Sequence, residues 1–486
     1  MKLLRYEFYE YFEKRQAEVL DEIQKIPAKI GMPDKYKGKI GLSGGSGSPP
    51  LVHKDVSEAM GKSSRTLMKV SDLDAEIRKI VKSYYGDEYD GAVTNTCEAA
   101  LHVTYDALFT PPFTGRGDNY RSKYIAPYER HLHHQAGYGR PFPPHYKDLS
   151  ADRGATAGEL GVYAKRLTNL ETVIVPLAGA DYTCHGIKYH PCTQLLNVNP
   201  EDSIKDIKKF ADINREYLSG IVSIGYDTPG YGYGVKDNEG TSKLQKYLGA
   251  LARYYNIPYV VDNARGTPFV GTDIRKIDAD VMVISTDKAF AGPTAGLIIG
   301  KEDKMIQIRR ALGLHGMRWG TGSSHGKAGY VAFDPGKEII AGLIKILEII
   351  KDTPEKVTKA VDEMYKITME EVKDIKPEIA EKLVITKSYN LMGVEINYEN
   401  AWGNENSRIP IFSIEDMYSG TNLIQKGCRA MGISPTLGYD SNMPFGPNIG
   451  TTDEYGVLME EPARYVVKSL LKMLEVLNEF AIKANK

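Results

Sequence analysis

The chain has 486 residues, with 62 Lys and Arg against 63 Asp and Glu, so its formal net charge is −1. Hydrophobic residues make up 42% and charged residues 26% of the sequence, which excludes a disordered, collagen-like or coiled-coil chain. The balanced charge argues against a nucleic-acid-binding or membrane-surface protein, because such proteins carry an excess of basic residues. At about 100–200 residues per domain, the length predicts two to four domains, or one large α/β domain with an appendage.

Neither the cysteines nor the first residues indicate export or a membrane. Cys97, Cys184, Cys192 and Cys428 are too few and too widely spaced for a disulfide framework. Residues 1–16 include acidic side chains where a signal peptide needs an apolar core. No apolar run approaches the roughly 20 residues that a membrane helix requires. We therefore expect a cytoplasmic protein without a membrane segment.

The predicted elements begin with an amphipathic helix at 1–30 and a loop rich in Gly, Ser and Pro at 41–50. From about residue 85 to 300, short apolar runs alternate with helical patterns such as 98–109 and 241–256. The runs that predict strands are 91–95, 123–127, 171–177, 219–226, 258–263, 281–287 and 295–300. Apolar strands that alternate with helices indicate a largely parallel sheet covered on both faces.

Two stretches depart from this alternation. Residues 110–158 are rich in Pro, Gly, His and Tyr, and predict an inserted loop over an active site or at a subunit contact. After residue 330 the pattern becomes helical, with predicted helices at 337–352, 354–375 and 461–485. We therefore divide the chain into three parts. They are an N-terminal helix and loop that packs with the small domain (1–55), a large domain (56–335) and a small C-terminal domain (336–486).

A carboxylate and an amine follow consecutive predicted strands. Asp262 lies at the end of one strand, and Lys288 follows the next strand 26 positions later. Parallel strands need a crossover of about this length, so both side chains are expected at the same carboxyl edge of the sheet. Such a lysine can link the aldehyde of pyridoxal phosphate, and the aspartate can keep the ring nitrogen protonated. Ser285, three residues before the lysine, could bind the cofactor phosphate. Aspartate and lysine at strand ends are, however, also common as ordinary surface residues.

A phosphate group also needs backbone N–H groups at a strand-to-helix junction, and residues 94–102 provide one. Thr94, Thr96 and the amides around Cys97 are the expected phosphate contacts. Cys97 could instead be a nucleophile at the helix N-terminus, but a small residue that lets the backbone approach a phosphate is the favoured interpretation. The histidines at 131–134 could hold a metal, but the sequence offers no companion set of Cys or Asp ligands, so we expect no metal site.

These segments resemble fold type I pyridoxal phosphate enzymes. Within that class they resemble the selenocysteine synthase family, which includes D-glucosaminate-6-phosphate ammonia-lyase. The resemblance implies a large domain with a mostly parallel seven-stranded sheet and a smaller α+β C-terminal domain. The segments that carry it are 43–60, 94–101, 260–266, 285–300 and 336–348.

The resemblance implies roles for particular residues. Lys288 would be the Schiff-base lysine, Asp262 the partner of the pyridinium nitrogen, and His133 or His134 the ring stacked on the cofactor. Thr321 would reach the phosphate of the neighbouring subunit in a homodimer, or in a larger assembly of dimers. The candidates for binding the substrate carboxylate are Arg265, Arg318, Arg408 and Arg429.

The implied activity is Cα deprotonation of a small amino-acid substrate, followed by β-elimination or β-replacement. An aminotransferase or a decarboxylase would use the same early steps. A catalytically silent binding protein on this fold is a further alternative, as is an enzyme that acts on seryl-tRNA. The balanced charge favours a small-molecule substrate over RNA.

Overall fold

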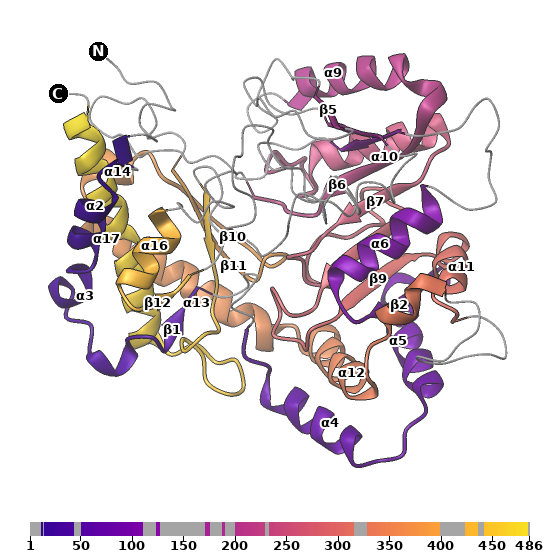
Figure 1. Cartoon of the computed structure of the whole chain (residues 1–486), viewed down its shortest axis with the longest axis horizontal. Helices are drawn as coiled ribbons and strands as arrows, with labels where there is room; N and C mark the ends of the chain where they lie inside the picture. Colours follow the sequence, from indigo (N-terminus) through magenta and orange to yellow (C-terminus); the bar gives the residue numbers. More distant parts are fainter. Residues whose placement is uncertain are drawn as a thin grey trace. The chain divides into compact units, whose positions relative to one another are not determined.

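The computed structural model describes eleven segments of the chain. They are residues 11–12, 14–42, 50–109, 123–126, 171–174, 187–189, 200–228, 233–314, 328–398, 423–435 and 442–484. The chain divides into two compact units, whose elements are labelled in Figure 1. The large unit comprises Asp55–Thr286 and Gly292–Asp352. The small unit comprises Met1–Lys54, Asp287–Ala291 and Thr353–Lys486.

The large unit is built on one sheet of eight strands, in the order β2-β9-β8-β7-β6-β3-β4-β5 among the described residues. All neighbours pair in parallel except β9, which is antiparallel to both β2 and β8. Every residue of β2, β6, β7 and β8 is buried, as expected of strands covered on both faces. The strand bounds are β2 Tyr89–Thr94, β3 Lys123–Ala126, β4 Glu171–Ile174, β5 Ile187–Tyr189, β6 Leu218–Ile224, β7 Tyr259–Asp262, β8 Val281–Ser285 and β9 Gly296–Lys301.

This sheet confirms the predicted α/β class and its mostly parallel strands. Each of the seven strands expected from the sequence has a counterpart in the structure. Within the described segments the sheet nevertheless has eight strands, one more than predicted, because β5 pairs in parallel with β4 at the sheet edge. A strand of three residues is too short to produce a recognisable apolar run.

Helices of the large unit pack on this sheet and on one another. α6 (Cys97–Leu108) and α11 (Glu302–Ala311) pack beside β2 and β9, while α10 (Lys243–Tyr255) packs on β6 and β7. α9 (Pro200–Ile213) packs against α10, and α5 (Val70–Tyr85) packs against β2. The buried residues of α5, α9 and α10 recur at helical spacing, so each of these helices buries one face. α6 is buried on most of its surface.

The chain passes from the large unit to the small unit at Thr353. The sequence predicts this boundary earlier, at residue 336. The difference is helix α12 (Lys337–Asp352), which packs against α5 and belongs to the large unit. Gly342 of α12 lies against Met60 and Val56 of α4 (Lys54–Ser64), where an added Cβ would come within 2.6 Å of Met60. This packing places α12 with the large unit.

The small unit has an antiparallel sheet of three strands in the order β10-β11-β13. Its bounds are β10 Val384–Ser388, β11 Gly393–Asn397 and β13 Asn442–Phe445. α13 (Glu355–Glu371) packs on β10 and β11, and α17 (Glu460–Ala484) packs against α13. The apolar residues of these elements form one continuous core.

The remaining elements of the small unit extend that core. α2 (Gln16–Ile23) packs against α16 (Leu423–Ala430) and α17, and β1 (Ile40–Gly41) pairs in parallel with β12 (Ile433–Ser434). The predicted helix at 1–30 is interrupted within the described residues, where a second helix, α3 (Ile26–Lys29), follows α2. Pro27 lies in the first turn of α3, and proline has no N–H to continue the preceding helix.

No helix in the described part of the chain combines the length and the apolar character needed to cross a bilayer.

A buried ion pair joins three elements of the large unit. Both terminal nitrogens of Arg309 in α11 donate to the carboxylate of Asp74 in α5, at 3.0 and 2.6 Å. Arg309 also donates to the carbonyl of Gly91 in β2 at 2.8 Å. Burial raises the pKa of Asp74, and the Arg309 guanidinium opposes that rise. Because burial of these charges is costly, each partner depends on the other.

We predict that Asp74→Leu destabilises the large unit by about 3–5 kcal/mol, because it leaves the Arg309 guanidinium buried without its carboxylate. The double variant Asp74→Leu/Arg309→Met should recover most of that loss. Urea unfolding followed by circular dichroism measures both effects. Glu76→Ala on the exposed part of α5 is the control, with an expected change below about 0.5 kcal/mol. A double variant as unstable as the single one would contradict this account.

Candidate active site

The carboxyl ends of three strands of the large unit meet at one edge of the sheet. β7 and β8 are parallel neighbours, and β2 runs in the same direction as β8 because both are antiparallel to β9. Asp262 is the last residue of β7, Ser285 is the last of β8, and Thr94 is the last of β2. Gly296 pairs with both Thr94 and Ser285, so it lies between them in the register. Asp262, Ser285 and Thr94 therefore end their strands at one edge of the sheet.

A close-packed turn fixes the position of Asp262. The Asp262 side chain is 1% exposed, and its Oδ1 accepts a hydrogen bond from the Ala264 N–H at 3.2 Å. The following residue, Asn263, is fully buried and donates from Nδ2 to Met282 Sδ at 3.3 Å. An added Cβ would come within 2.3 Å of the Asn263 side chain at Gly225 and within 2.0 Å at Gly266. Only glycine fits at these two positions.

Lys288 lies on a short loop after β8 whose two ends are joined. The Thr286 N–H donates to the Ala295 carbonyl at 3.1 Å, and the Gly292 N–H donates to the Thr286 carbonyl at 3.0 Å. The buried Thr286 hydroxyl also donates to the Pro293 carbonyl. These bonds close the base of the loop that carries Lys288. The Lys288 residue itself is half-buried.

The N-terminus of α6 follows directly after β2. The Thr96 side chain caps this helix by accepting the Ala99 N–H at 3.1 Å. The Thr94 hydroxyl donates to the Thr96 carbonyl at 2.8 Å and is fully buried, so it supports the turn. Cys97, the first helical residue, is 7% exposed. The first turn of such a helix favours an anion through its N–H groups and its dipole.

Asn95 attaches this turn to a second segment. Its backbone N–H donates to the Phe333 carbonyl at 2.8 Å, and its Nδ2 donates to the Ala332 carbonyl at 2.6 Å. Both acceptors belong to the short helix η4 (Ala328–Phe333). No local sequence pattern marks Asn95, Asn263 or Thr286, because their roles depend on partners that only the folded chain brings to them.

The other predicted site residues are placed as follows. Arg265 is 5% exposed and lies in the turn after β7, three residues beyond Asp262. Arg429 is exposed on α16 of the small unit. The predicted site residues outside the described residues are His133, His134, Thr321, Arg318 and Arg408. No group of three or more potential metal-ligating His, Cys, Asp or Glu occurs within the described segments.

These residues fit pyridoxal phosphate. The buried carboxylate suits the ring nitrogen of that cofactor, and a lysine on the next strand's loop suits its aldehyde. The capped helix N-terminus suits its phosphate. Gly296 lets β9 approach the turn before α6 closely, because a Cβ there would come within 2.3 Å of the Thr96 carbonyl.

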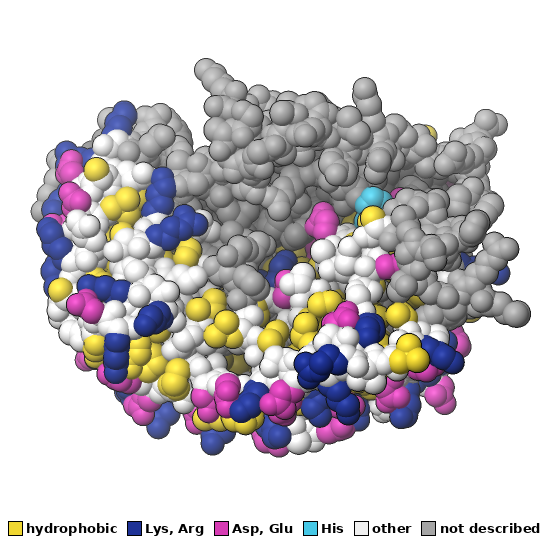
Figure 2. Space-filling view, turned by 60° about the horizontal axis from the view of Figure 1, so that its bottom comes forward, with side chains coloured by type: hydrophobic (Ala, Val, Ile, Leu, Met, Phe, Trp, Pro, Cys, Tyr) yellow, Lys and Arg dark blue, Asp and Glu magenta, His cyan; other side chains and the backbone are white. Residues whose placement is uncertain are grey.

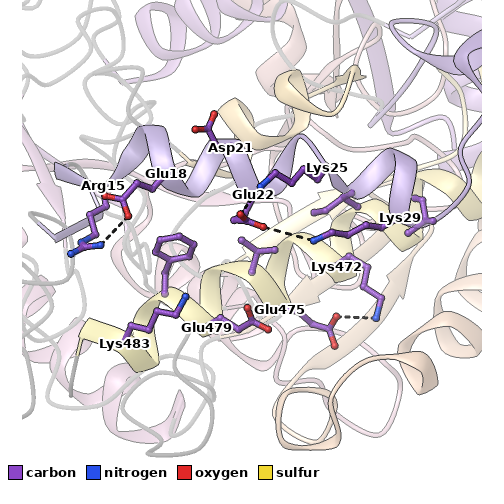
Figure 3. A pocket seen from close by; sticks show the side chains of 14 residues that line it. Arg15, Glu18, Asp21, Glu22, Lys25, Lys29, Lys472, Glu475, Glu479 and Lys483 are labelled. Atoms are coloured by element: carbon purple, nitrogen blue, oxygen red, sulfur yellow. Dashed lines mark hydrogen bonds and ion pairs between the residues drawn. The ribbon is translucent and has the colours of Figure 1, made fainter.

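A separate groove of about 740 Å³ lies between α2, α3 and α17 of the small unit. Figure 3 shows that its lining is dominated by charged side chains of both signs, several of which face one another. Arg15 pairs with Glu18 at 2.9 Å, and Lys472 pairs with Glu475 at 2.9 Å. None of the predicted site residues lines this groove.

Residues 234–398 match the family model of class-V aminotransferases. No curated protein sequence matches the chain.

Solved structures are similar to the chain over most of its length. Pyridoxamine-pyruvate aminotransferase from Mesorhizobium loti aligns with a TM-score of 0.50 and 13% identity, covering 93% of this chain and 97% of that one. D-Glucosaminate-6-phosphate ammonia-lyase aligns with a TM-score of 0.44 and 15% identity, covering 94% and 100%. The SepCysS–SepCysE N-terminal domain complex aligns with a TM-score of 0.45 and 14% identity, covering 91% and 98%.

The aminotransferase structure shows that the chain has the fold of fold type I enzymes. The family match includes Asp262 and Lys288. The predicted cofactor, pyridoxal phosphate, and the predicted fold type are confirmed.

We predict that Gly296→Ala raises the dissociation constant of pyridoxal phosphate about tenfold or more, because its Cβ would displace the Thr96 carbonyl and the Thr94 hydroxyl. Absorbance titration of the apoprotein measures this constant. Gly61→Ala is the matched control, since an added Cβ meets nothing within 4 Å in α4. Equal dissociation constants for Gly296→Ala and the wild type would show that the turn at Thr96 does not hold the phosphate.

Proposed function

Taking the chain as a fold type I enzyme that uses pyridoxal phosphate, we propose that it acts on a small amino acid by removing the Cα proton. The reaction that follows is β-elimination or β-replacement. One observation carries this proposal: Asp262 ends β7, and Lys288 follows β8, its parallel neighbour. A buried carboxylate and a nearby lysine are the two groups that this chemistry requires of the protein.

Pyridoxal phosphate, when bound, supplies an electron-withdrawing ring that stabilises negative charge at the substrate Cα. The Asp262 carboxylate, 1% exposed, holds a proton at the ring nitrogen. Its burial strengthens this interaction, because the local dielectric is lower than that of water. Lys288 accepts the Cα proton as a general base and returns a proton later in the cycle.

The N-terminus of α6 binds the cofactor phosphate in this proposal. The amides around Cys97 and the side chains of Thr96 and Ser285 are the direct contacts. Thr94 acts through the turn, because its hydroxyl donates to the Thr96 carbonyl. Arg265 is the arginine that we propose for the substrate carboxylate, since it is buried in the turn that follows Asp262.

The choice of reaction among pyridoxal phosphate chemistries rests on the sequence resemblance to the selenocysteine synthase family. Transamination shares Cα deprotonation, and decarboxylation differs in the bond that is broken. Against an RNA substrate, the 62 basic and 63 acidic residues of the chain balance one another. Figure 2 shows both kinds interspersed where described residues are visible.

The sequence predictions about location, oligomeric state and the residues around the cofactor belong to this proposal. The enzyme is a cytoplasmic homodimer, or a multiple of dimers, with Thr321 reaching the phosphate of the neighbouring subunit. His133 or His134 stacks on the cofactor ring. Incubation with a panel of free and phosphorylated amino acids, with assays for ammonia and keto acid, would distinguish elimination from transamination.

We predict that borohydride reduction attaches the cofactor to the tryptic peptide that contains Lys288. Lys288→Ala should abolish this mass increment and lower turnover by at least about 100-fold, because the general base is lost. Lys304→Ala, a change in a lysine of α11, is the control and should leave both unchanged. Attachment of the cofactor to any other lysine would refute the proposal.

A second prediction concerns Asp262. Asp262→Asn should retain the attached cofactor but lower turnover by about 10²–10⁴-fold, because an amide does not hold a proton on the ring nitrogen. Asp262→Glu should recover part of the activity. Steady-state kinetics with cofactor occupancy measured in parallel tests this role. Full activity of Asp262→Asn would contradict it.

A further inference from the structure

A cluster of three titratable side chains joins α6 to η4 within the large unit. His102 and Asp106 of α6 are four residues apart, so they share one face of that helix. His102 Nε2 lies 3.5 Å from the Asp106 carboxylate, and the Tyr330 hydroxyl of η4 donates a hydrogen bond to the same carboxylate. None of the three takes part in the proposed function, although two of them belong to the helix whose N-terminus binds the phosphate.

Ring contacts pack η4 against the same face of α6. The His102 ring meets the rings of Tyr330 and Phe333 edge-on, with centroids 6.0 and 5.2 Å away. The Tyr330 and Phe333 rings also contact each other, with centroids 5.4 Å apart. A 3₁₀ helix of six residues has poor hydrogen-bond geometry of its own, so side-chain contacts of this kind decide where it lies.

The hydrogen bond from Tyr330 to Asp106 is the polar part of this contact. Burial raises the pKa of the Tyr330 hydroxyl, and the hydrogen bond to Asp106 raises that pKa further. The hydroxyl is therefore protonated at neutral pH and remains a donor. A hydrogen bond to a carboxylate is stronger than one between neutral groups, so this bond holds η4 on α6 more firmly than ring packing alone.

η4 also holds the turn at residues 94–97, which we call the phosphate turn. The last carbonyls of a helix have no donor within it, and Asn95 supplies two donors to those of η4. Its backbone N–H donates to the Phe333 carbonyl, and its Nδ2 donates to the Ala332 carbonyl. Since Asn95 lies inside the phosphate turn, a shift of η4 would move that turn. η4 thus connects the middle of α6 with the residues at its N-terminus.

We propose that Tyr330 and Asp106 are positioning residues for the cofactor phosphate, which act through η4 and Asn95. This inference rests on the proposed function, which places the phosphate at the N-terminus of α6, and adds two residues to it. A helix N-terminus binds an anion through N–H groups that point at it, and hydrogen bonds weaken steeply when they are misaligned. The ring and the aldehyde of the cofactor have other partners, Asp262 and Lys288, so the effect is confined to the phosphate.

The test compares pyridoxal phosphate with pyridoxal, which lacks the phosphate, by absorbance titration of the apoprotein. The ratio of the two dissociation constants measures the preference that the phosphate contributes. Tyr330→Phe removes only the hydroxyl and should lower this preference about fivefold or more. Asp106→Leu should lower it by a similar factor. Asp106→Asn keeps an oxygen that can accept the Tyr330 O–H, so it should restore most of the preference.

Tyr255→Phe is the matched control, because the Tyr255 hydroxyl of α10 also donates to a carboxylate on another helix, that of Asp212 in α9. This change should leave the preference unaltered. A purely structural role for Tyr330 would weaken the binding of both compounds equally. An unchanged preference in either Tyr330→Phe or Asp106→Leu would therefore overturn the inference, and so would Asp106→Asn as impaired as Asp106→Leu. Borohydride attachment of the cofactor at Lys288 in the wild type reports separately whether the proposed function holds.

Discussion

The parallel pairing of β7 with β8 is the constraint on which the rest of the site depends. This pairing places the end of one strand, Asp262, beside the strand that leads to Lys288. Antiparallel β9 then returns between β8 and β2, so that Gly296 separates Thr94 from Ser285. One sheet edge thereby collects a carboxylate, the base of a lysine loop and a helix N-terminus. These are the protein groups that a phosphorylated pyridine aldehyde requires.

Tight backbone packing holds the carboxylate, the lysine loop and the helix N-terminus at this edge. Most of the hydrogen bonds involved are made by the backbone or by supporting side chains. Asn263 is enclosed by Gly225 and Gly266, and the lysine loop is closed at Thr286. Ala291, in the same loop, has a φ of 56°, in the left-handed region that non-glycine residues rarely adopt. Such strain persists where the surrounding structure over-determines the conformation, and it clusters at functional sites. The base of the loop that carries Lys288 is therefore held by backbone hydrogen bonds.

Strong periodic signals in the sequence allowed most strands of the large sheet to be predicted. Apolar β-branched runs predicted seven strands. The spacing of Asp262 and Lys288 suggested a common edge, and the resemblance of several segments to fold type I enzymes predicted the cofactor. The edge strand β5 was too short to be recognised. The boundary at Thr353 depends on how α12 packs against α5, which periodicity within α12 does not specify. The supporting roles of Asn95, Asn263 and Thr286 require partners distant in sequence, so no local pattern reveals them.

We propose a single cofactor site, at the carboxyl edge of β2, β7 and β8. A crystal structure of the protein with pyridoxal phosphate tests this most directly. The account predicts continuous density from Lys288 Nζ to the cofactor, Asp262 within hydrogen-bond distance of the ring nitrogen, and the phosphate at the N-terminus of α6. Cofactor density elsewhere, for example in the groove between α2 and α17, would contradict it.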